Sequence, residues 1–385
     1  MKKICFVTTI YGTFDAFLAK FSEFLDQSGE YEISLICDGA SMQGYTPPAC
    51  VTVHPIEIQR GISLSGVLSV IKIYRILKTN HFDIVQYSTP NAAFYTSIAA
   101  KLARVPHRLY GQWGIRYMGF HGFSRKIFKL LEKITCRLST FVEVESHHLR
   151  TFAIEEKLYP ASKSAVIWNG SAAGVDLEKF DISKRDAWRR EIREKYGIDT
   201  ASTVLTFAGR LTADKGVNEL LEAFFSLPKD SGALLMIMGS FDDTSLLNFD
   251  LLDRAKKDDR VIFCGRVKDV EKHFAAADLF IAPSYREGFG IVVIEAGAMG
   301  LGSIVSDVPG QIDAIEKDVT GVAVPVKDAG ALSKAMLSLI GDREKCDAMG
   351  RAAHDFVAMN FEQRKLFARL KQQRDQMIED ASCRK

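Results

Sequence analysis

The sequence predicts an α/β protein with two doubly wound domains, each a parallel β-sheet covered by helices on both faces. The 385 residues exceed the roughly 250–300 at which a single hydrophobic core stops growing. Short, continuously apolar strands alternate with helical segments, a pattern typical of parallel sheets buried on both sides. The alternation starts again after a glycine-rich segment near residue 170. We therefore expect two Rossmann-like domains, whose strand-end loops face each other across a cleft.

The first half alternates five strands with four helices. Its first helix, 13–27, carries phenylalanine and leucine at helical spacing. The predicted strands are 2–10, 32–37, 82–88, 107–112 and 140–146, and the remaining helices are 65–78, 91–103 and 124–138.

The second half repeats this alternation and ends in a long charged helical pattern, with a break expected near Asn360. The strands are 202–210, 232–240, 260–266, 277–284, 301–307 and 321–326, and the helices include 217–227, 268–277 and 329–340. Turn-forming residues at 169–181 predict a hinge. The expected domains are 1–168 and 182–360, with a helix at about 361–380 packing back on the first domain.

Composition points to a cytoplasmic protein. The 47% hydrophobic and 25% charged residues are those of a soluble globular chain. Seven scattered cysteines without paired spacing argue against a disulfide framework or zinc site and for a reducing compartment. The apolar run at the start is too short for a signal peptide, and no run reaches the ~20 residues of a membrane span.

The first half is strongly basic between residues 60 and 137, where 13 Lys and Arg face 2 acids. Such asymmetry indicates an anionic partner. The helix 124–138, with Ser124 as its expected cap, has one apolar and one basic face and follows an aromatic segment. This favours peripheral binding to anionic lipid; the alternative is an ordinary helix docked on its own sheet. Nucleic acid is disfavoured, because no recognisable binding module is present.

The segment FAGRLTADKG places Arg210 just after a strand and Lys215 just before a helix. Two cations and free helix N-terminal amides at one strand-to-helix turn form a cradle for a diphosphate. The alternative is a solvated loop with a helix cap.

The segment SYREGFGIVVIEAGAMG holds two acids, Glu287 in a loop and Glu295 inside a helix. Gly288 and Gly290 allow the backbone to approach a ligand closely. Carboxylates accept hydrogen bonds from vicinal hydroxyls, so Glu295 suits a ribose and Glu287 a hexose. A salt-bridged surface pair is the alternative, and the apolar run between the acids disfavours it.

Four segments resemble retaining glycosyltransferases of family 4, which have the GT-B fold: FDIVQYST, NG…GVDLEKF, FAGRLTADKG and APSYREGFGIVVIEAGAMG. The resemblance covers nearly the whole chain. It implies that Arg210 and Lys215 stabilise the leaving diphosphate, that Glu295 binds the ribose and that Glu287 contacts the donor sugar. It also implies a catalytic set of Arg210, Lys215 and Glu287, with no metal and no cofactor. The further donor-binding residues would be Gly12, Arg266, Val267, Gly288, Phe289 and Gly290.

Two segments depart from the family pattern. Where many relatives have Tyr-x-x-His-Gly, with the histidine near the reacting centre, this chain has Trp113. Trp113 would stack on a sugar or acceptor, or pack in the cleft. The first loop has the single glycine Gly12 instead of a pair. Candidate acceptor contacts are Trp113, Arg116, Arg125 and Lys126.

The resemblance to capsule, exopolysaccharide and O-antigen enzymes implies sugar transfer from a nucleotide-sugar, UDP favoured over GDP, to an undecaprenyl-diphosphate-linked saccharide at the inner face of the cytoplasmic membrane. Three alternatives remain open: a GDP-sugar (mannosyl-type) transferase, a nucleotide-sugar 2-epimerase of the same fold, and a non-catalytic sugar-nucleotide-binding partner protein. A nicotinamide oxidoreductase is disfavoured, because GxGxxG does not follow the first strand.

Overall fold

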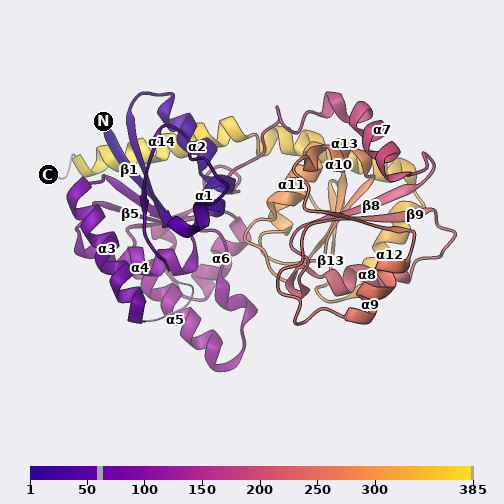
Figure 1. Ribbon diagram of the computed structural model, residues 1–385, viewed down its shortest axis with the longest axis horizontal. Helices are drawn as coiled ribbons and strands as arrows, with labels where there is room; N and C mark the ends of the chain where they lie inside the picture. The colour runs from indigo at the N-terminus through magenta and orange to yellow at the C-terminus, as the bar shows by residue number, and fades with distance from the viewer. Residues whose placement is uncertain (59–63, 383–385) are drawn as a thin grey trace. The chain divides into compact units, whose positions relative to one another are not determined.

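The computed structural model describes residues 1–58 and 64–382. The chain divides into two compact units: Met1–Ala173 together with Arg364–Lys385 forms the N-terminal unit, and Gly174–Gln363 forms the C-terminal unit (Figure 1). The first boundary falls within the predicted hinge, 169–181. Both units contain a parallel sheet, so the prediction of two Rossmann-like, doubly wound domains is confirmed.

The N-terminal unit has a seven-stranded sheet in the order β3-β2-β1-β4-β5-β6-β7. Its strands are β1 (Lys2–Ile10), β2 (Tyr31–Asp38), β3 (Val51–Pro55), β4 (Ile84–Tyr87), β5 (His107–Gln112), β6 (Phe141–Val144) and β7 (Ser164–Ala165). The strands β3 and β7 were not predicted from the sequence. Both are short edge strands with little apolar signal of their own, and they form because a neighbouring strand offers a partner.

Helices cover both faces of this sheet. Apolar residues of α1 (Tyr11–Phe17), α2 (Ala19–Asp26) and α14 (Gln363–Ser382) share one core. The opposite core contains residues of α3 (Leu64–Asn80), α4 (Pro90–Leu102), α5 (Gly122–Leu138) and α6 (His147–Glu155). Figure 1 shows these four helices on the other side of the sheet from α2 and α14. None of the described helices has both the length and the hydropathy needed to cross a bilayer.

Two local predictions in this unit were wrong. The expected single helix 13–27 is two helices, because the backbone leaves the helical region at Leu18 (φ −125°, ψ −20°). Ser124 is not a cap but lies inside α5, which begins at Gly122 after the extended residue His121.

The C-terminal helix α14 belongs to the N-terminal unit. Leu366 and Phe367 are buried in the core with α1 and α2. Arg374, fully buried, donates hydrogen bonds to Glu143 of β6 and to Gln86 of β4, the latter over 2.9 Å. A buried charge must be paired and hydrogen-bonded, so these contacts anchor the helix on the sheet. The expected break before it occurs at Phe361, since α13 (Arg343–Asn360) ends just upstream.

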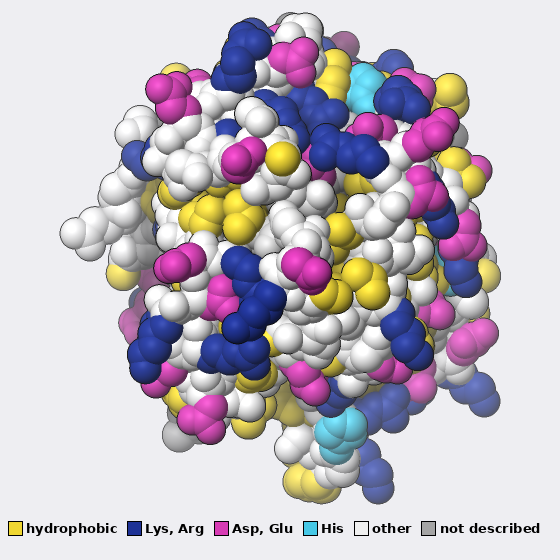
Figure 2. Space-filling view, turned by 90° about the vertical axis from the view of Figure 1, so that its right-hand side faces the viewer, with side chains coloured by type: hydrophobic (Ala, Val, Ile, Leu, Met, Phe, Trp, Pro, Cys, Tyr) yellow, Lys and Arg dark blue, Asp and Glu magenta, His cyan; other side chains and the backbone are white. Residues whose placement is uncertain are grey.

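The C-terminal unit has a six-stranded sheet in the order β10-β9-β8-β11-β12-β13. Its strands are β8 (Thr203–Ala208), β9 (Ala233–Met238), β10 (Val261–Gly265), β11 (Leu279–Ala282), β12 (Gly302–Ser306) and β13 (Gly321–Val324). Its helices are α7 (Arg185–Tyr196), α8 (Val217–Phe225), α9 (Phe249–Lys257), α10 (Val270–Ala276), α11 (Ile291–Ala298), α12 (Ala329–Ile340) and α13. Figure 2 shows one face of this unit, where basic and acidic side chains are interspersed.

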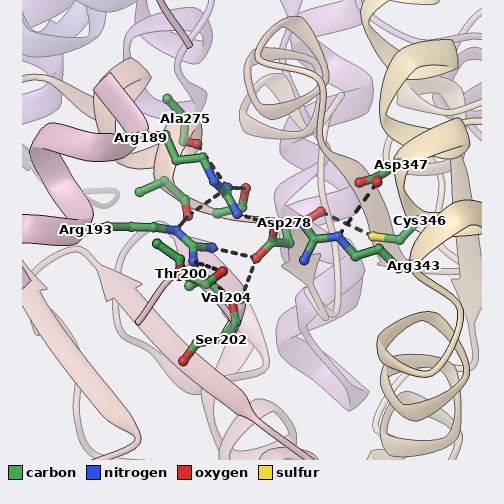
Figure 3. Close-up of polar contacts among 12 residues, drawn as sticks. Arg189, Arg193, Thr200, Ser202, Val204, Ala275, Asp278, Arg343, Cys346 and Asp347 are labelled. Carbon is green, nitrogen blue, oxygen red and sulfur yellow. Dashed lines mark hydrogen bonds and ion pairs between the residues drawn. The ribbon is translucent and has the colours of Figure 1, made fainter. Parts of the chain in front are cut away.

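A buried ion network holds the amino ends of the two central strands (Figure 3). Asp278, directly before β11, accepts hydrogen bonds from Arg193 over 2.8 Å, from Arg189 over 2.7 Å and from the backbone N–H of Val204 in β8 over 2.8 Å. Both Asp278 and Arg193 are buried. Arg343 of α13 donates a longer hydrogen bond to Asp278, over 3.3 Å. The network therefore fixes β8 and β11 side by side and leaves their carboxyl ends to carry the candidate site.

Candidate active site

The candidate donor site lies at the carboxyl ends of β8 and β11, which are neighbours in the middle of the sheet. From β8 the chain continues outward through β9 and β10, and from β11 it continues the other way through β12 and β13. Doubly wound sheets bind ligands where the strand order reverses in this manner. The loop after β8 carries Arg210 and Lys215, and the loop after β11 carries Glu287.

Backbone packing brings these two loops together. Lys215 ends a short 3-10 turn, and Gly216 then adopts φ +72°. A Cβ atom at Gly216 would lie 2.0 Å from the carbonyl oxygen of Pro283, so only glycine permits this approach. As a result, Lys215 Nζ lies 2.5 Å from Glu287 Oε1, with about a fifth of each side chain exposed (21% and 20%). The structure thus brings together two of the three residues predicted as catalytic.

Arg210 lies at the exposed edge of the same loop. Its guanidinium pairs with Asp242 over 2.9 Å, and more than half of each side chain is exposed. Asp214, next to Lys215, has a pKa below its ordinary value. Burial opposes this shift, but the hydrogen bond from Thr212 and the nearby cations outweigh it; these cations are Arg286, Arg210 and Lys215. Cations of both loops thus gather around Asp214, and a bound diphosphate would compete with the acids that are paired to them.

Glu295 is the fifth residue of α11, which begins after Gly290 in the left-handed conformation (φ +77°). Burial raises the pKa of the Glu295 carboxyl to about 7, although the charge of Lys179 opposes this and that of Glu271 adds to it. No hydrogen bond joins the carboxyl to any other residue in the parts of the chain that the structure describes. The side chain is partly exposed, so an acid with this raised pKa and no side-chain partner among the described residues is a typical functional group that a ligand can reach.

The other predicted donor contacts surround these loops. The Phe289 side chain is buried in the core, with its ring centroid 5.2 Å from that of Phe361, so only the backbone at Gly288–Gly290 is placed to meet a ligand. Arg266 is exposed directly after β10, and Val267 packs on the core. Donor contacts by these residues stay predictions.

The candidate residues of the N-terminal unit are mostly packed against neighbours. Gly12 lies inside α1, where a Cβ would come 3.0 Å from the hydroxyl of Tyr45. The Trp113 ring packs against Phe17 with centroids 4.9 Å apart. This contact agrees with the packing alternative for Trp113, and stacking on a sugar stays a prediction.

The three predicted acceptor cations differ in environment. Arg116 follows β5 and lies over the ring of Phe128, 4.6 Å from its centroid. Arg125 pairs with Glu156 over 3.4 Å, and Lys126 is exposed. Their contacts with an acceptor stay predictions.

Sequence reasoning missed two residues. Arg286 precedes Glu287 and forms an ion pair with Asp214 over 3.2 Å, linking the β11 loop to the β8 loop a second time. Glu132, the only acid of α5, is buried with its pKa raised to about 7, because burial disfavours its charged form. The sequence signal that could have identified Glu132 is that it is the single acid within an otherwise basic helix.

Comparisons with known proteins match both units. Residues 189–356 match the family model of glycosyl transferases group 1, and residues 3–146 match that of glycosyl transferase 4-like proteins. The capsular polysaccharide biosynthesis glycosyltransferase CapM of Staphylococcus aureus is 28% identical over 311 residues, 80% of each chain. The Escherichia coli protein named UDP-Gal:alpha-D-GlcNAc-diphosphoundecaprenol alpha-1,3-galactosyltransferase is 26% identical, covering 82% of this chain and 81% of its own.

Among solved structures, Anabaena Alr3699/HepE in complex with UDP-glucose matches with a TM-score of 0.78 and 20% identity, covering 100% of both chains. WaaG, described as a glycosyltransferase involved in lipopolysaccharide biosynthesis, matches with a TM-score of 0.73 and 17% identity, covering 97% of this chain and 99% of its own. Two parallel Rossmann-like sheets, two matching family models and these fold neighbours agree. The chain belongs to the GT-B glycosyltransferases of the family 4 type.

Proposed function

We propose that this glycosyltransferase transfers a sugar, with retention of anomeric configuration, from a nucleoside-diphosphate sugar to a lipid-linked saccharide in surface polysaccharide biosynthesis. The favoured donor nucleotide is UDP, with GDP as the competitor, and the favoured acceptor lipid is undecaprenyl diphosphate. The observation that carries the proposal is the contact of Lys215 with Glu287 at the strand-order reversal of the C-terminal unit.

The donor chemistry follows from this contact. When the bond between the anomeric carbon and the diphosphate oxygen breaks, negative charge grows on the departing diphosphate. Arg210 and Lys215 would stabilise that charge, and such preorganised electrostatics is usually the largest catalytic contribution. Glu295 would accept hydrogen bonds from the ribose hydroxyls, and Glu287 would contact the donor sugar. No metal is included, since the two side chains supply the positive charge.

The relatives support the finer assignment. The E. coli relative is named for a UDP-sugar donor and a diphosphoundecaprenol acceptor. A Campylobacter jejuni relative, 26% identical over 280 residues, is named for a diphospho-undecaprenol acceptor and transfer of N-acetylgalactosamine. The HepE structures contain UDP or UDP-glucose.

The outer surfaces of α3 and α5 support peripheral attachment to the inner face of the cytoplasmic membrane. On α5, Phe123 and Leu130 are 77% and 57% exposed. Beside them lie the exposed cations Lys126, Lys133 and Arg137. Helix α3 adds the exposed apolar residues Val67, Leu68 and Ile71. Exposed apolar side chains among cations match the composition of helices that lie in the headgroup region of anionic bilayers.

Charge reversal tests the membrane assignment. Changing Lys126, Lys133 and Arg137 to Glu should abolish pelleting with vesicles rich in anionic phospholipid and leave donor binding intact. Changing Lys229, Lys256 and Lys257 of the C-terminal unit to Glu alters the net charge equally and should leave pelleting unchanged. If both variants lost vesicle pelleting equally, the effect would come from net charge alone. That result would contradict a membrane-binding face on the N-terminal unit.

Ligand binding tests the transferase assignment. Thermal unfolding should be measured with UDP, GDP and their sugars, because a ligand that binds only the folded state raises its apparent stability. We expect the largest shift with a UDP-sugar. Radiolabelled donor should then label a lipid-linked saccharide. Epimerised sugar-nucleotide without acceptor, or binding without any turnover, would overturn the proposal.

A further inference from the structure

A cavity of about 160 Å³ lies in the N-terminal unit between α4 and α5. Its wall is formed mainly by aromatic and aliphatic side chains, among them Phe94, Tyr95, Phe128 and Leu131. Four polar side chains also line it: Asn91, Arg116, Glu132 and Thr135.

The size and lining of this cavity suit a small branched hydrocarbon unit. An apolar cavity of roughly 150 Å³ takes up benzene, so this one has room for a five- or six-carbon fragment. Three aromatic rings and Leu131 supply the apolar contacts. On α5, Leu130 adjoins the lining residue Leu131, and Phe123 lies one helical turn before the lining residue Ile127; both are exposed on the helix surface that we assign to the membrane. A chain leaving the cavity would therefore find apolar surface close by.

Arg116 places a cation at the same wall. Its guanidinium is held over the rings of Phe128 and Phe120, at 4.6 and 5.8 Å from their centroids. An anion bound there would be separated from the hydrocarbon by little more than one ring. In a prenyl diphosphate the chain is bonded directly to the phosphate, whereas in a phospholipid glycerol and ester groups intervene. The short separation therefore favours the prenyl chain over a bilayer acyl chain.

We propose that this cavity binds the isoprene unit nearest the diphosphate of the lipid-linked acceptor, with Arg116 contacting that diphosphate. The proposal rests on the proposed function and adds the place where the lipid is recognised. It assigns a role to α4 and α5 beyond attachment to the bilayer surface.

Glu132 is compatible with an apolar occupant. Its Oε1 accepts hydrogen bonds from Tyr110 over 2.9 Å and from Gln112 over 2.6 Å, which fix the carboxyl in the wall. Because burial raises its pKa to about 7, the neutral form is well populated at neutral pH. The neighbouring acids, Tyr110 and Cys136, have pKa values raised well above their usual range by burial and stay neutral. When Glu132 is neutral, Arg116 is the charged side chain of the cavity wall.

Filling the cavity provides the first test. Leu131→Trp places an indole in the cavity, whereas Leu337→Trp adds the same group at an exposed position on α12 of the C-terminal unit. With an undecaprenyl-diphosphate-linked saccharide, Leu131→Trp should raise the acceptor KM at least tenfold, and Leu337→Trp should change it less than threefold. With the same saccharide on a short soluble alkyl chain, both variants should match the unchanged protein.

The soluble acceptor separates the two proposals. If the unchanged protein uses no prenyl-linked acceptor at all, the proposed function fails. If it uses that acceptor and Leu131→Trp has the same KM as Leu337→Trp, only the cavity assignment is overturned.

A second measurement uses the unchanged protein and needs no variant. A farnesyl diphosphate analogue with a diazirine on its first isoprene unit should label peptides 90–95 and 127–135 of the full chain. Unlabelled farnesyl diphosphate should compete with the probe, and phospholipid vesicles without prenyl lipid should not. Labelling confined to other peptides, or equal competition by the vesicles, would rule out prenyl recognition in this cavity.

Discussion

Lys215 Nζ lies 2.5 Å from Glu287 Oε1, so a cation from the β8 loop and an acid from the β11 loop neutralise each other at the centre of the sheet. Both side chains are only partly exposed, and their attraction is less screened than that of the surface pair of Arg210 with Asp242. A bound diphosphate would compete with Glu287 for Lys215. Glu287, released from Lys215, would then be available to the sugar attached to that diphosphate.

Replacing Lys215 should impair catalysis more than folding. We expect Lys215→Ala to lower turnover by roughly two to three orders of magnitude, the effect of losing one donor that stabilises a developing anion. Lys215→Arg should retain more activity than Lys215→Ala. Steady-state transfer assays beside thermal unfolding check this, with the exposed Lys256→Ala as control. A folded Lys215→Ala protein with full turnover would remove Lys215 from the mechanism.

Glu295 should make donor binding depend on pH. Its carboxyl has a pKa raised to about 7 by burial, and the charged form accepts the stronger hydrogen bonds from hydroxyls. Donor affinity should therefore rise by about tenfold from pH 6 to pH 8, since the ionised fraction rises from about a tenth to nine-tenths. Calorimetry with a nucleotide-sugar measures this, because its diphosphate diester does not titrate in that interval. Glu295→Gln should bind more weakly at pH 8 and with a flat profile, whereas the exposed Glu344→Gln should keep the slope. A flat profile in the unchanged protein would contradict the assignment.

Asp278 should matter for stability. Its removal leaves the buried guanidinium of Arg193 without its carboxylate partner, and breaking a buried pair typically costs about 3–5 kcal/mol. We expect Asp278→Ala to lower the free energy of unfolding by that amount in urea titrations. Asp347 forms only an exposed contact with Arg343 over 3.7 Å, so Asp347→Ala should cost about 1 kcal/mol or less. Similar losses in the two variants would show that the network of Figure 3 contributes no special stability.

Glu132 should make the N-terminal unit less stable in alkaline than in acidic solution. Its folded-state pKa, about 7, lies above its ordinary value of 4.5, so the folded state binds the proton more tightly. The stabilisation of the folded state by protonated Glu132 is complete below pH 4.5 and is lost as the pH rises through 7. The free energy of unfolding changes by about 3 kcal/mol over this interval. Glu132→Gln cannot ionise at this position and should not show this loss. Its free energy of unfolding should therefore rise relative to that of the unchanged protein between pH 5 and pH 8. Unfolding titrations at both pH values check this, with the exposed Glu155→Gln as control. A constant difference between Glu132→Gln and the unchanged protein at both pH values would contradict the prediction.

The interior strands and the positions of the loops that carry Lys215 and Glu287 were predictable because each carries a strong local signal. Apolar runs such as 202–210 and 277–284 give buried parallel strands, and the motifs around Lys215 and Glu287 sit where those strands end. The edge strands β3 and β7 were not predictable, because their formation depends on a neighbouring strand more than on their own residues. The cavity beside Glu132 arises from packing between α4 and α5, and no spacing along the chain encodes it.

Helix α14 has a consequence for biosynthesis. The apolar residues Leu366, Phe367 and Leu370 complete a core whose other buried residues come from the first 110 residues. During translation the N-terminal unit therefore cannot complete its core until the C-terminal unit and α14 have been synthesised. Until then the surface that α14 covers stays exposed. The C-terminal unit is continuous from Gly174 to Gln363 and has no such delay. Translation that stops before α14 would release a chain with one finished unit and one exposed to aggregation and proteolysis.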